Sequence, residues 1–277
     1  MEVRKEGGKY GISLESYIDR IADKFGLGDA KFAKTPMEDG FIKTREDSPP
    51  LKTNTQYRSL VGALLYVAVC ARPDIAASVS ILGRSVCAPT EADWVAAKRV
   101  VRYLKGTKDW QLRYGDPEGK LVGYADADWA GDLKSRKSTT GTVFMYAGGA
   151  ISWTSRLQDF VTLSSMESEY VALSEASQEA VWLLKLFEDF GEPSFKPVTL
   201  WEDNQSCIKF VSSERTTKRS RHIETRQCFV KELCDAGVLK LLYCSTEEMA
   251  ADLLTKALGQ IKLRKFAGMV GLTGGDR

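Results

Sequence analysis

The sequence predicts an α/β fold: a mixed five-stranded sheet flanked by helices, preceded by a mainly helical region. Apolar residues recur at helical spacing through much of residues 1–110, whereas short β-like runs begin after residue 110. These later segments read as three strands, a helix, a strand, helices, a strand and a helix, which describes a mixed sheet with helices on its faces. With 277 residues, 43% hydrophobic and 27% charged, the chain can bury a sizeable core.

The first 110 residues contain a predicted hairpin and four predicted helices. Gly7-Gly8 lies between two short β-like pieces, Val3 to Ile12, as in a hairpin. Ser13 resembles a helix N-cap, and Gly26 is a suitable stop for the helix that follows. Residues 28–54 lack a sustained period and predict an extended connection. Three further helices are expected at 56–71, 73–85 and 91–106, the last behind a capping box formed by Thr90 and Asp93.

The segment from 120 to 258 alternates between strands and helices. It is expected to form one domain, with residues 259–277 as a C-terminal tail. Gly148-Gly149 separates two of the strands, and Gly237 ends the helix before the last one. Strands are predicted at 121–126, 141–147, 150–154, 198–203 and 239–244, and helices at 165–190, 205–212, 224–236 and 247–258.

Composition excludes several classes of protein. The six cysteines form no C-x-x-C pair and His222 is the single histidine, which argues against a zinc site and favours reduced thiols. No N-terminal segment resembles a signal peptide, and no apolar run is long enough to span a membrane. We therefore expect a cytosolic or nuclear protein, with no membrane partner and no secretion. The net charge of +2 decides nothing alone.

Four acids stand beside apolar segments, where a carboxylate is costly unless its charge is compensated. They are Asp126, Glu169, Asp203 and Asp252. Glu169 has the clearest pattern, because an apolar stripe follows it at spacings of 4, 3, 4, 3 and 4: Leu173, Ala176, Ala180, Leu183 and Phe187.

Each acid also has a simpler explanation. Glu169 suits a solvated helix N-terminus, Asp203 a helix N-cap, Asp126 a turn, and Asp252 an exposed helix face. Their combination in one α/β unit instead predicts a site for divalent cations, and hence phosphate chemistry.

A collinear series of motifs resembles the ribonuclease H domain of copia-type retrotransposon polyproteins over residues 120–258. Three motifs upstream of this domain resemble the end of that family's reverse transcriptase: Tyr57-Arg58-Ser59-Leu60-Val61-Gly62, Arg72-Pro73-Asp74 and Val101 to Thr107. The ribonuclease H-like motifs are Tyr-Ala-Asp-Ala-Asp-Trp-Ala-Gly-Asp (124–132), Arg-Lys-Ser-Thr-Thr-Gly (136–141), Ile-Ser-Trp (151–153), Leu-Ser-Ser-Met-Glu-Ser-Glu-Tyr (163–170), Glu-Asp-Asn-Gln-Ser (202–206), Arg-His-Ile-Glu (221–224) and Ala-Asp-Leu-Leu-Thr-Lys-Ala-Leu (251–258).

The resemblance implies a ribonuclease H-like fold behind a truncated reverse transcriptase. The family's metal-binding tetrad carries over onto Asp126, Glu169, Asp203 and Asp252 as catalytic residues and metal ligands. Two Mg²⁺ ions, with Mn²⁺ as a substitute, would then support hydrolysis of the RNA strand of an RNA–DNA hybrid. Asp128 and Glu202 receive no role beyond that of neighbours.

Basic and amide side chains near these motifs suggest contacts with the hybrid. Charge runs are also typical of plain solvated surfaces, and a lone histidine such as His222 is more often structural; Cys228 stands where the family often has a second histidine. Beside a phosphodiester site, phosphate and minor-groove contacts become the better reading. The candidate nucleic-acid-binding residues are Lys134, Arg136, Lys137, Asn204, Gln205, Arg215, Lys218, Arg219, Arg221 and His222.

The sequence leaves three functions open. The main hypothesis is a ribonuclease H, whose second partner would be the reverse-transcriptase portion that this chain lacks, since no Tyr-x-Asp-Asp motif is present. The second is a catalytically inactive nucleic-acid-binding remnant of the polyprotein. The third is a nuclease that acts on DNA with the same metal chemistry.

Overall fold

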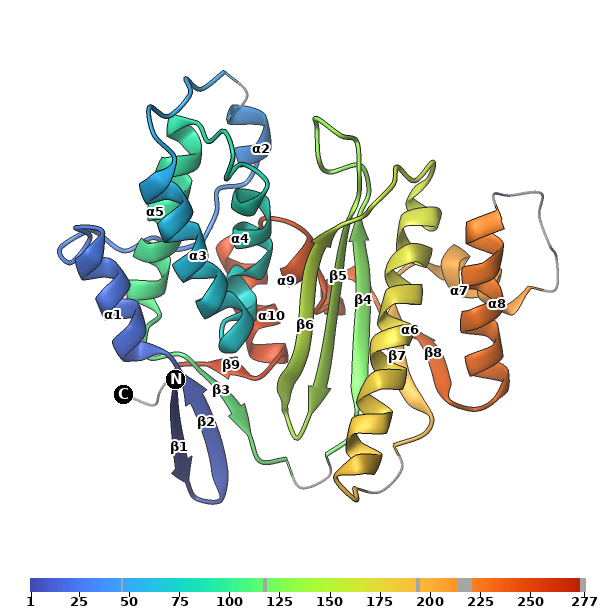
Figure 1. Ribbon diagram of the computed structural model, residues 1–277. Helices are drawn as coiled ribbons and strands as arrows, with labels where there is room; N and C mark the ends of the chain where they lie inside the picture. The colour runs from blue at the N-terminus through green and yellow to red at the C-terminus, as the bar shows by residue number, and fades with distance from the viewer. Residues whose placement is uncertain (46, 117–118, 193–194, 214–220, 275–277) are drawn as a thin grey trace. The chain divides into compact units, whose positions relative to one another are not determined.

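The structure is a computed structural model that describes residues 1–277 except 46, 117–118, 193–194, 214–220 and 275–277. For residues 44, 221–225 and 227 it describes the backbone alone. The chain divides into two compact units (Figure 1). Unit 1 comprises Met1–Asp116 and Lys256–Arg277, and unit 2 comprises Pro117–Thr255. Unit 1 is therefore discontinuous in sequence, with unit 2 inserted between its two parts.

A four-stranded antiparallel sheet organises unit 1. Its strands are β1 (Glu2–Glu6), β2 (Lys9–Ser13), β3 (Gln111–Tyr114) and β9 (Leu272–Thr273), in the spatial order β1-β2-β3-β9. The hairpin predicted around Gly7-Gly8 is confirmed, and both glycines adopt positive φ, 56° and 82°. The strands β3 and β9 were not predicted, because neither is long enough to show an alternating pattern.

Helices make up the rest of unit 1. They are α1 (Glu15–Lys24), α2 (Phe41–Thr44), α3 (Thr55–Cys70), the 3₁₀ turn η1 (Pro73–Ile75), α4 (Ala76–Gly83), α5 (Glu91–Gly106) and α10 (Gln260–Met269). The capping box at Thr90 and Asp93 is confirmed at the start of α5. The extended connection expected at 28–54 contains the short α2. Residues 259–277, expected as a tail, contribute α10 and β9 to unit 1.

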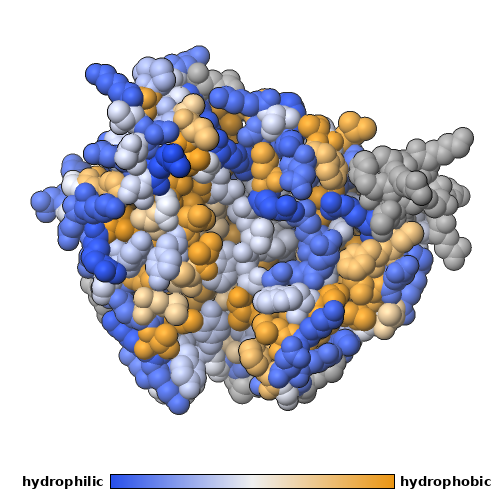
Figure 2. All heavy atoms as spheres, viewed as in Figure 1, coloured by the Kyte–Doolittle hydropathy of each residue, from blue (hydrophilic) through white to orange (hydrophobic). Residues whose placement is uncertain are grey.

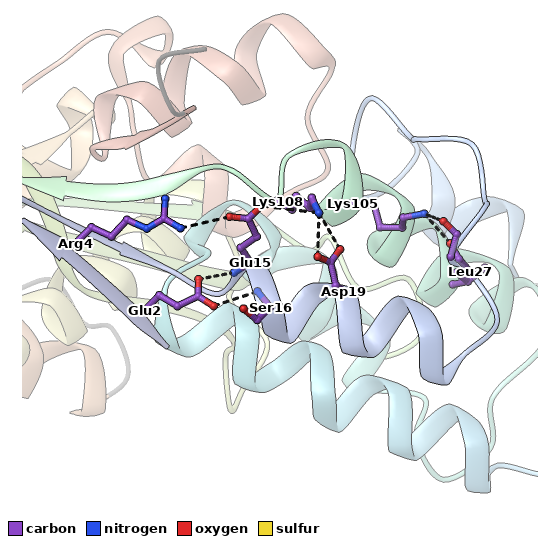
Figure 3. Close-up of polar contacts among 9 residues, drawn as sticks. Glu2, Arg4, Glu15, Ser16, Asp19, Leu27, Lys105 and Lys108 are labelled. Atoms are coloured by element: carbon purple, nitrogen blue, oxygen red, sulfur yellow. Dashed lines mark hydrogen bonds and ion pairs between the residues drawn. The ribbon is translucent and has the colours of Figure 1, made fainter.

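The N-terminus of α1 corrects one prediction. Ser13 does not cap the helix; its hydroxyl donates to Glu2 Oε2 at 3.0 Å. Glu2, on β1, instead accepts from the backbone N–H groups of Glu15 and Ser16 at 3.2 and 3.1 Å (Figure 3). A carboxylate from a neighbouring strand thus satisfies the first N–H groups of the helix and suits its dipole. These hydrogen bonds lower the pKa of Glu2.

A buried ion pair joins the helices of unit 1. Arg72 is 1% exposed and donates to both carboxylate oxygens of Asp74 at 2.9 and 2.7 Å. Two of its three remaining N–H groups donate to the carbonyl and hydroxyl of Thr107 at 2.9 and 2.6 Å. The Tyr103 hydroxyl donates to Asp74 Oδ2 at 2.6 Å, so the carboxylate that pairs with the buried guanidinium is itself held in place.

Unit 2 contains the mixed five-stranded sheet that the sequence predicts. Its strands are β4 (Val122–Asp128), β5 (Thr139–Tyr146), β6 (Gly149–Leu157), β7 (Val198–Glu202) and β8 (Leu239–Tyr243), in the spatial order β6-β5-β4-β7-β8. The first three strands along the chain are antiparallel, whereas β4–β7 and β7–β8 are parallel. The strand β4 therefore lies at the centre, where the antiparallel and parallel halves meet.

Five helical segments accompany this sheet: α6 (Ser165–Asp189), α7 (Gln205–Ser212), α8 (Arg221–Asp235), the 3₁₀ turn η2 (Thr246–Glu248) and α9 (Asp252–Thr255). The long helix α6 packs on β4 and β5 and contributes the predicted apolar stripe to the core. Gly123 is needed there, because a Cβ at this position would lie 2.5 Å from Leu200 and 2.6 Å from Phe144. The continuous helix predicted at 247–258 is wrong: η2 and α9 are separate, with Met249 extended between them (ψ 90°).

The surface of the described residues is mixed in character. On the face shown in Figure 2, hydrophobic side chains lie among hydrophilic ones. Among the described helices, none combines the length and the apolar character that crossing a membrane requires.

Candidate active site

Two parallel strands place the first two acids. The register of β4 and β7 pairs Tyr124 with Trp201, and the two rings stack with centroids 6.3 Å apart. Continued by two residues, the same register brings Asp126 level with Asp203. Asp126 is 2% exposed within β4, whereas Asp203 follows the end of β7 and is half-buried. Neighbouring parallel strands end at the same edge of a sheet, which is where α/β proteins bind ligands.

The helix α6 supplies the third acid. Ser164 caps its N-terminus by accepting from the Glu167 backbone N–H at 3.2 Å. Glu169 lies one turn further on and is only 7% exposed, so its carboxylate is inside the protein rather than in solvent. The solvated helix acid that we weighed as the simpler explanation for Glu169 is therefore wrong.

Asp126, Glu169 and Asp203 converge. One carboxylate oxygen from each of the three residues lies within 4.8 Å of those of the other two. The pKa of Glu169 is raised well above 4.5, first by burial and then by the negative charges of Asp126, Glu202 and Asp203. Three acids from two strands and a helix thus form a compact, electrostatically strained cluster.

Glu202 is a fourth carboxylate near this cluster, and the sequence alone assigned it no role beyond that of a neighbour. It is fully buried, and its pKa is raised well above 4.5 mainly by burial and also by Asp203 and Asp126. Its Oε1 accepts from the Asn204 backbone N–H at 3.0 Å. The signal was present in the alternation of β7, where Val198, Leu200 and Glu202 share the buried face.

Asp252 is not a member of the three-acid group, although its helix adjoins the same strands. It is 1% exposed and begins α9, which contacts β4, β5 and β6. From the same turn, the Thr255 hydroxyl donates to Asp126 Oδ2 at 2.6 Å. Gly141, paired with Asp126 across β4 and β5, admits this helix: a Cβ there would lie 2.6 Å from Thr255 Cγ2 and 2.9 Å from the Ala251 carbonyl oxygen.

The turn after β7 separates the roles of three adjacent polar residues. Asn204, not Asp203, is the N-cap of α7, and its side-chain oxygen accepts from the Cys207 N–H at 3.1 Å. This leaves the Asn204 amide nitrogen, rather than its oxygen, for contact with a ligand. Gln205 is exposed. Asp203 instead accepts from the Thr246 hydroxyl at 2.7 Å, which links β7 to η2.

The basic loop between β4 and β5 is well formed. Asp132 Oδ1 accepts from both the backbone and the hydroxyl of Ser135 at 2.8 Å, and this turn holds Arg136 at a positive φ of 58°. Lys134 and Arg136 are exposed and Lys137 is half-buried; none of the three makes an ion pair with a described residue. The candidates Arg215, Lys218 and Arg219 lie outside the described residues, and the side chains of Arg221 and His222 are likewise not described.

The donor set fits a divalent cation. All three converging groups are carboxylates, which hard cations such as Mg²⁺ prefer. Glu169 Oε2 and Glu202 Oε2 are both buried, and neither has a hydrogen-bond partner among the described residues. A cation would compensate charges that now oppose one another and would give the buried oxygens a partner.

The strand order of unit 2, with carboxylates converging beside its central strand, defines a ribonuclease H-like domain. Comparison with known proteins agrees. The chain is 37% identical over 271 residues to the retrovirus-related Pol polyprotein from transposon TNT 1-94 of Nicotiana tabacum, a match that covers 95% of this chain and 20% of that protein. The chain belongs to the copia-type retrotransposon Pol family and spans about a fifth of that polyprotein's length.

Two further similarities differ in extent. A secreted RxLR effector protein 161 of Plasmopara viticola is 52% identical over 131 residues, which cover 47% of this chain and 92% of that protein. Among solved structures, the foamy viral protease-reverse transcriptase in complex with double-stranded DNA aligns with a TM-score of 0.50 at 13% identity, covering 89% of this chain and 45% of that one. This second likeness concerns the fold. No protein-family model matches the chain.

Proposed function

We propose that this chain is a metal-dependent ribonuclease H that hydrolyses the RNA strand of RNA–DNA hybrids. The observation that carries the proposal is the convergence of Asp126, Glu169 and Asp203 within 4.8 Å beside the central strand of a ribonuclease H-like sheet. Asp252, the fourth acid of the family resemblance, would serve as a further ligand beside them. Membership of a retrotransposon Pol family supports a hybrid as the substrate.

The chain's own residues would prepare the site in three ways. Asp126, Glu169 and Asp203 would hold Mg²⁺ or Mn²⁺, with Asp252 beside them. Thr255 and Thr246 fix the orientation of Asp126 and Asp203 through hydrogen bonds of 2.6 and 2.7 Å. Burial of Asp126 and Glu169 keeps water from competing for their oxygens. The bound metal would supply an activated water and charge stabilisation for hydrolysis of a phosphodiester.

The hybrid would be held mainly through its phosphates. Lys134, Arg136 and Lys137 form a basic loop at the end of β4, and phosphate contacts of this kind position a nucleic acid without reading its sequence. Gln205 and the amide nitrogen of Asn204 lie after β7 beside Asp203, where they are suited to the 2′-hydroxyls of the RNA strand. The basic residues from Arg215 to Arg221 are proposed to extend this surface.

The test is the Asp203→Asn variant, which keeps the side chain's size and removes a charged oxygen ligand. We expect its rate of hybrid cleavage at saturating substrate to fall by roughly 100-fold or more, because ligands and charge stabilisation act on the transition state. Its affinity for the hybrid, measured with a chelator present, should change little. The matched control is Asp189→Asn, the same chemical change at an exposed position near the far end of α6.

The other candidate functions are outcomes of the same assay. A labelled hybrid, the matched DNA duplex and double-stranded RNA are incubated with the unaltered chain and Mg²⁺. Cleavage of the DNA duplex in preference to the hybrid would replace the proposal with a DNA nuclease. Binding of the hybrid without cleavage of any substrate would leave the inactive nucleic-acid-binding remnant.

A further inference from the structure

The connection between β6 and α6, residues 158–164, begins with a glutamine that lies inside the protein (Figure 1). Gln158 is 1% exposed, although glutamine is a residue that mostly stays at the surface. Its Nε2 donates to the Thr140 hydroxyl at 3.1 Å and to the Ser168 carbonyl oxygen at 3.0 Å. The amide therefore joins β5 to the start of α6, where Ser168 directly precedes Glu169.

The partners of this amide fix its orientation. The Ser168 carbonyl oxygen can only accept a hydrogen bond, so the amide presents its nitrogen to it. The amide oxygen, Oε1, is left buried with no hydrogen-bond partner among the described residues. An unpaired buried oxygen lowers stability, so an apolar side chain of the same size would fill this space at less cost. What the amide adds is the link between α6 and β5.

This link closes a ring of contacts that includes Glu169. Thr140 pairs with Ala127 across β5 and β4. The Ala127 backbone N–H in turn donates to the Glu169 carboxylate, and Ala127 directly follows Asp126 in β4. A closed ring of this kind holds the Glu169 carboxylate beside that of Asp126, although the two charges repel each other. Five residues form the ring: Gln158, Ser168, Glu169, Ala127 and Thr140.

Buried hydroxyl groups tie the same segments together a second time. Ser138 directly precedes β5, and its hydroxyl lies 2.9 Å from that of Thr162, in the connection before α6. The Ser138 hydroxyl also accepts from the Ala130 backbone N–H at 3.1 Å, and its carbonyl oxygen accepts from the Gln158 backbone N–H at 2.8 Å. The loop after β4, the start of β5 and the connection before α6 are thus cross-linked, so Gln158 is itself held in place.

We propose that Gln158 is a positioning residue for Glu169. Its amide holds the start of α6 against β5, and this keeps the Glu169 carboxylate within 4.8 Å of those of Asp126 and Asp203. At 1% exposure it acts through Glu169 rather than on the substrate. The inference rests on the ribonuclease proposal in one respect, since Glu169 serves cleavage only as a metal ligand. Removing a group that orients a metal ligand lowers metal affinity or activity by roughly 10–100-fold.

The test uses Gln158→Met in the full chain, which keeps the approximate size of the side chain and removes both hydrogen bonds. The matched control is Ser177→Ala, which removes another buried hydrogen bond of α6, from the Ser177 hydroxyl to the Leu173 carbonyl oxygen at 2.8 Å. Ser177 lies about two turns beyond Glu169. The loss of one buried hydrogen bond should lower the stability of the control without moving the acids.

The first measurement is thermal melting over a series of Mg²⁺ concentrations. The Mg²⁺ concentration that gives half of the full stabilisation should be about tenfold higher for Gln158→Met than for the parent and Ser177→Ala. The rate of hybrid cleavage at saturating hybrid should fall by about tenfold or more, because the metal ligand is misplaced. The KM for the hybrid should stay within about twofold, since phosphate contacts elsewhere hold the hybrid.

The second measurement needs neither metal nor cleavage. With a chelator at pH 8, the Tm is compared for the parent, Glu169→Gln, Gln158→Met and the double variant. If the amide holds Glu169 against the other carboxylates, Glu169→Gln relieves less repulsion once Gln158 is replaced, because the side chain has already moved away. We expect its rise in Tm to be about half as large in that background, since Coulomb repulsion halves when the separation doubles. In the Ser177→Ala background the rise should be unchanged.

Two results would overturn the inference. One is a parent-like Mg²⁺ dependence of Gln158→Met when the parent responds to Mg²⁺. The other is an equal rise in Tm from Glu169→Gln with and without Gln158. If the parent neither responds to Mg²⁺ nor cleaves a hybrid, the ribonuclease proposal fails, and the comparison in chelator alone decides whether Gln158 positions Glu169. If Gln158→Met does not fold, Thr140→Val replaces it in both measurements, because it removes one of the two hydrogen bonds and keeps the shape of the side chain.

Discussion

Replacing Glu169 by Gln should stabilise the metal-free protein while weakening its response to Mg²⁺. Glu169 is 7% exposed, and its carboxylate lies within 4.8 Å of those of Asp126 and Asp203. At an effective dielectric constant of about 20, two unit charges at 4.8 Å repel by roughly 3.5 kcal/mol. Glutamine removes the charge and keeps the shape, so these repulsions disappear.

The gain should be smaller than the full repulsion, because Glu169 already avoids part of it by holding its proton more tightly. We expect about 1–3 kcal/mol at pH 7.5 with a chelator present, which corresponds to a rise in Tm of roughly 4–12 °C for a domain of this size. Mg²⁺ at 100-fold above its Kd stabilises a native site by about 2.7 kcal/mol. If Glu169→Gln binds Mg²⁺ tenfold more weakly, it loses about 1.4 kcal/mol of this stabilisation. Added Mg²⁺ should therefore narrow the difference in stability between the variant and the parent.

The assay is thermal unfolding of parent, Glu169→Gln and Glu232→Gln, each with a chelator and with Mg²⁺. Glu232 is exposed on α8, so the same chemical change there should alter neither measurement. Equal Tm values for the parent and Glu169→Gln in chelator would refute the repulsion between the carboxylates at this site. Equal shifts on adding Mg²⁺ would refute Glu169 as a metal ligand.

Three further predictions concern the pH dependence of Glu169, the close packing at Gly141 and the buried ion pair of Arg72. Burial and neighbouring acids raise the pKa of Glu169 above 4.5, so its contribution to stability is complete below about pH 4.5 and is lost as the pH rises through its folded pKa. The metal-free stability advantage of Glu169→Gln, measured by urea titration, should therefore grow with pH. A stability difference that stays constant with pH would contradict this. Gly141→Ala should lower the free energy of unfolding by about 1–3 kcal/mol and should also slow hybrid cleavage, because its Cβ would displace Thr255 and α9. A variant as stable and active as the parent would show that α9 moves freely. Arg72→Met should lower the free energy of unfolding by roughly 3–5 kcal/mol, because Asp74 would remain buried with its negative charge uncompensated. Adding Asp74→Asn should restore part of that stability. A double variant as unstable as Arg72→Met would show that the loss comes from packing alone.

Periodicity was enough to predict α6 and β7, two of the elements of unit 2 that position the acids. The stripe from Leu173 to Phe187 identified α6 and the side of it on which Glu169 lies, and the apolar run ending at Trp201 identified β7. These patterns are local, so a single sequence contains them. The resemblance then selected Asp126 rather than its neighbour Asp128, and Asp203 rather than its neighbour Glu202.

Features that depend on distant pairing could not be predicted in the same way. The strands β3 and β9 have four and two residues and form through their partners rather than through a pattern of their own. The cap of α1 comes from Glu2 on another strand, although Ser13 had the right residue type at the right place. Burial of Glu202 contradicts the usual preference of carboxylates for water, so the alternation of β7 alone gave too little reason to expect it.

The discontinuity of unit 1 has a consequence for biosynthesis. Gln111 on β3 pairs with Thr273 on β9, so the two strands of this pair are synthesised before and after the whole of unit 2. During translation, unit 2 is complete before the last strand of unit 1 exists. Early folding of unit 2 would shorten the effective loop that this pairing must close, since a compact insert has far less chain entropy than an unfolded one of equal length. A lesion that delays folding of unit 2 would thereby also delay the final assembly of unit 1.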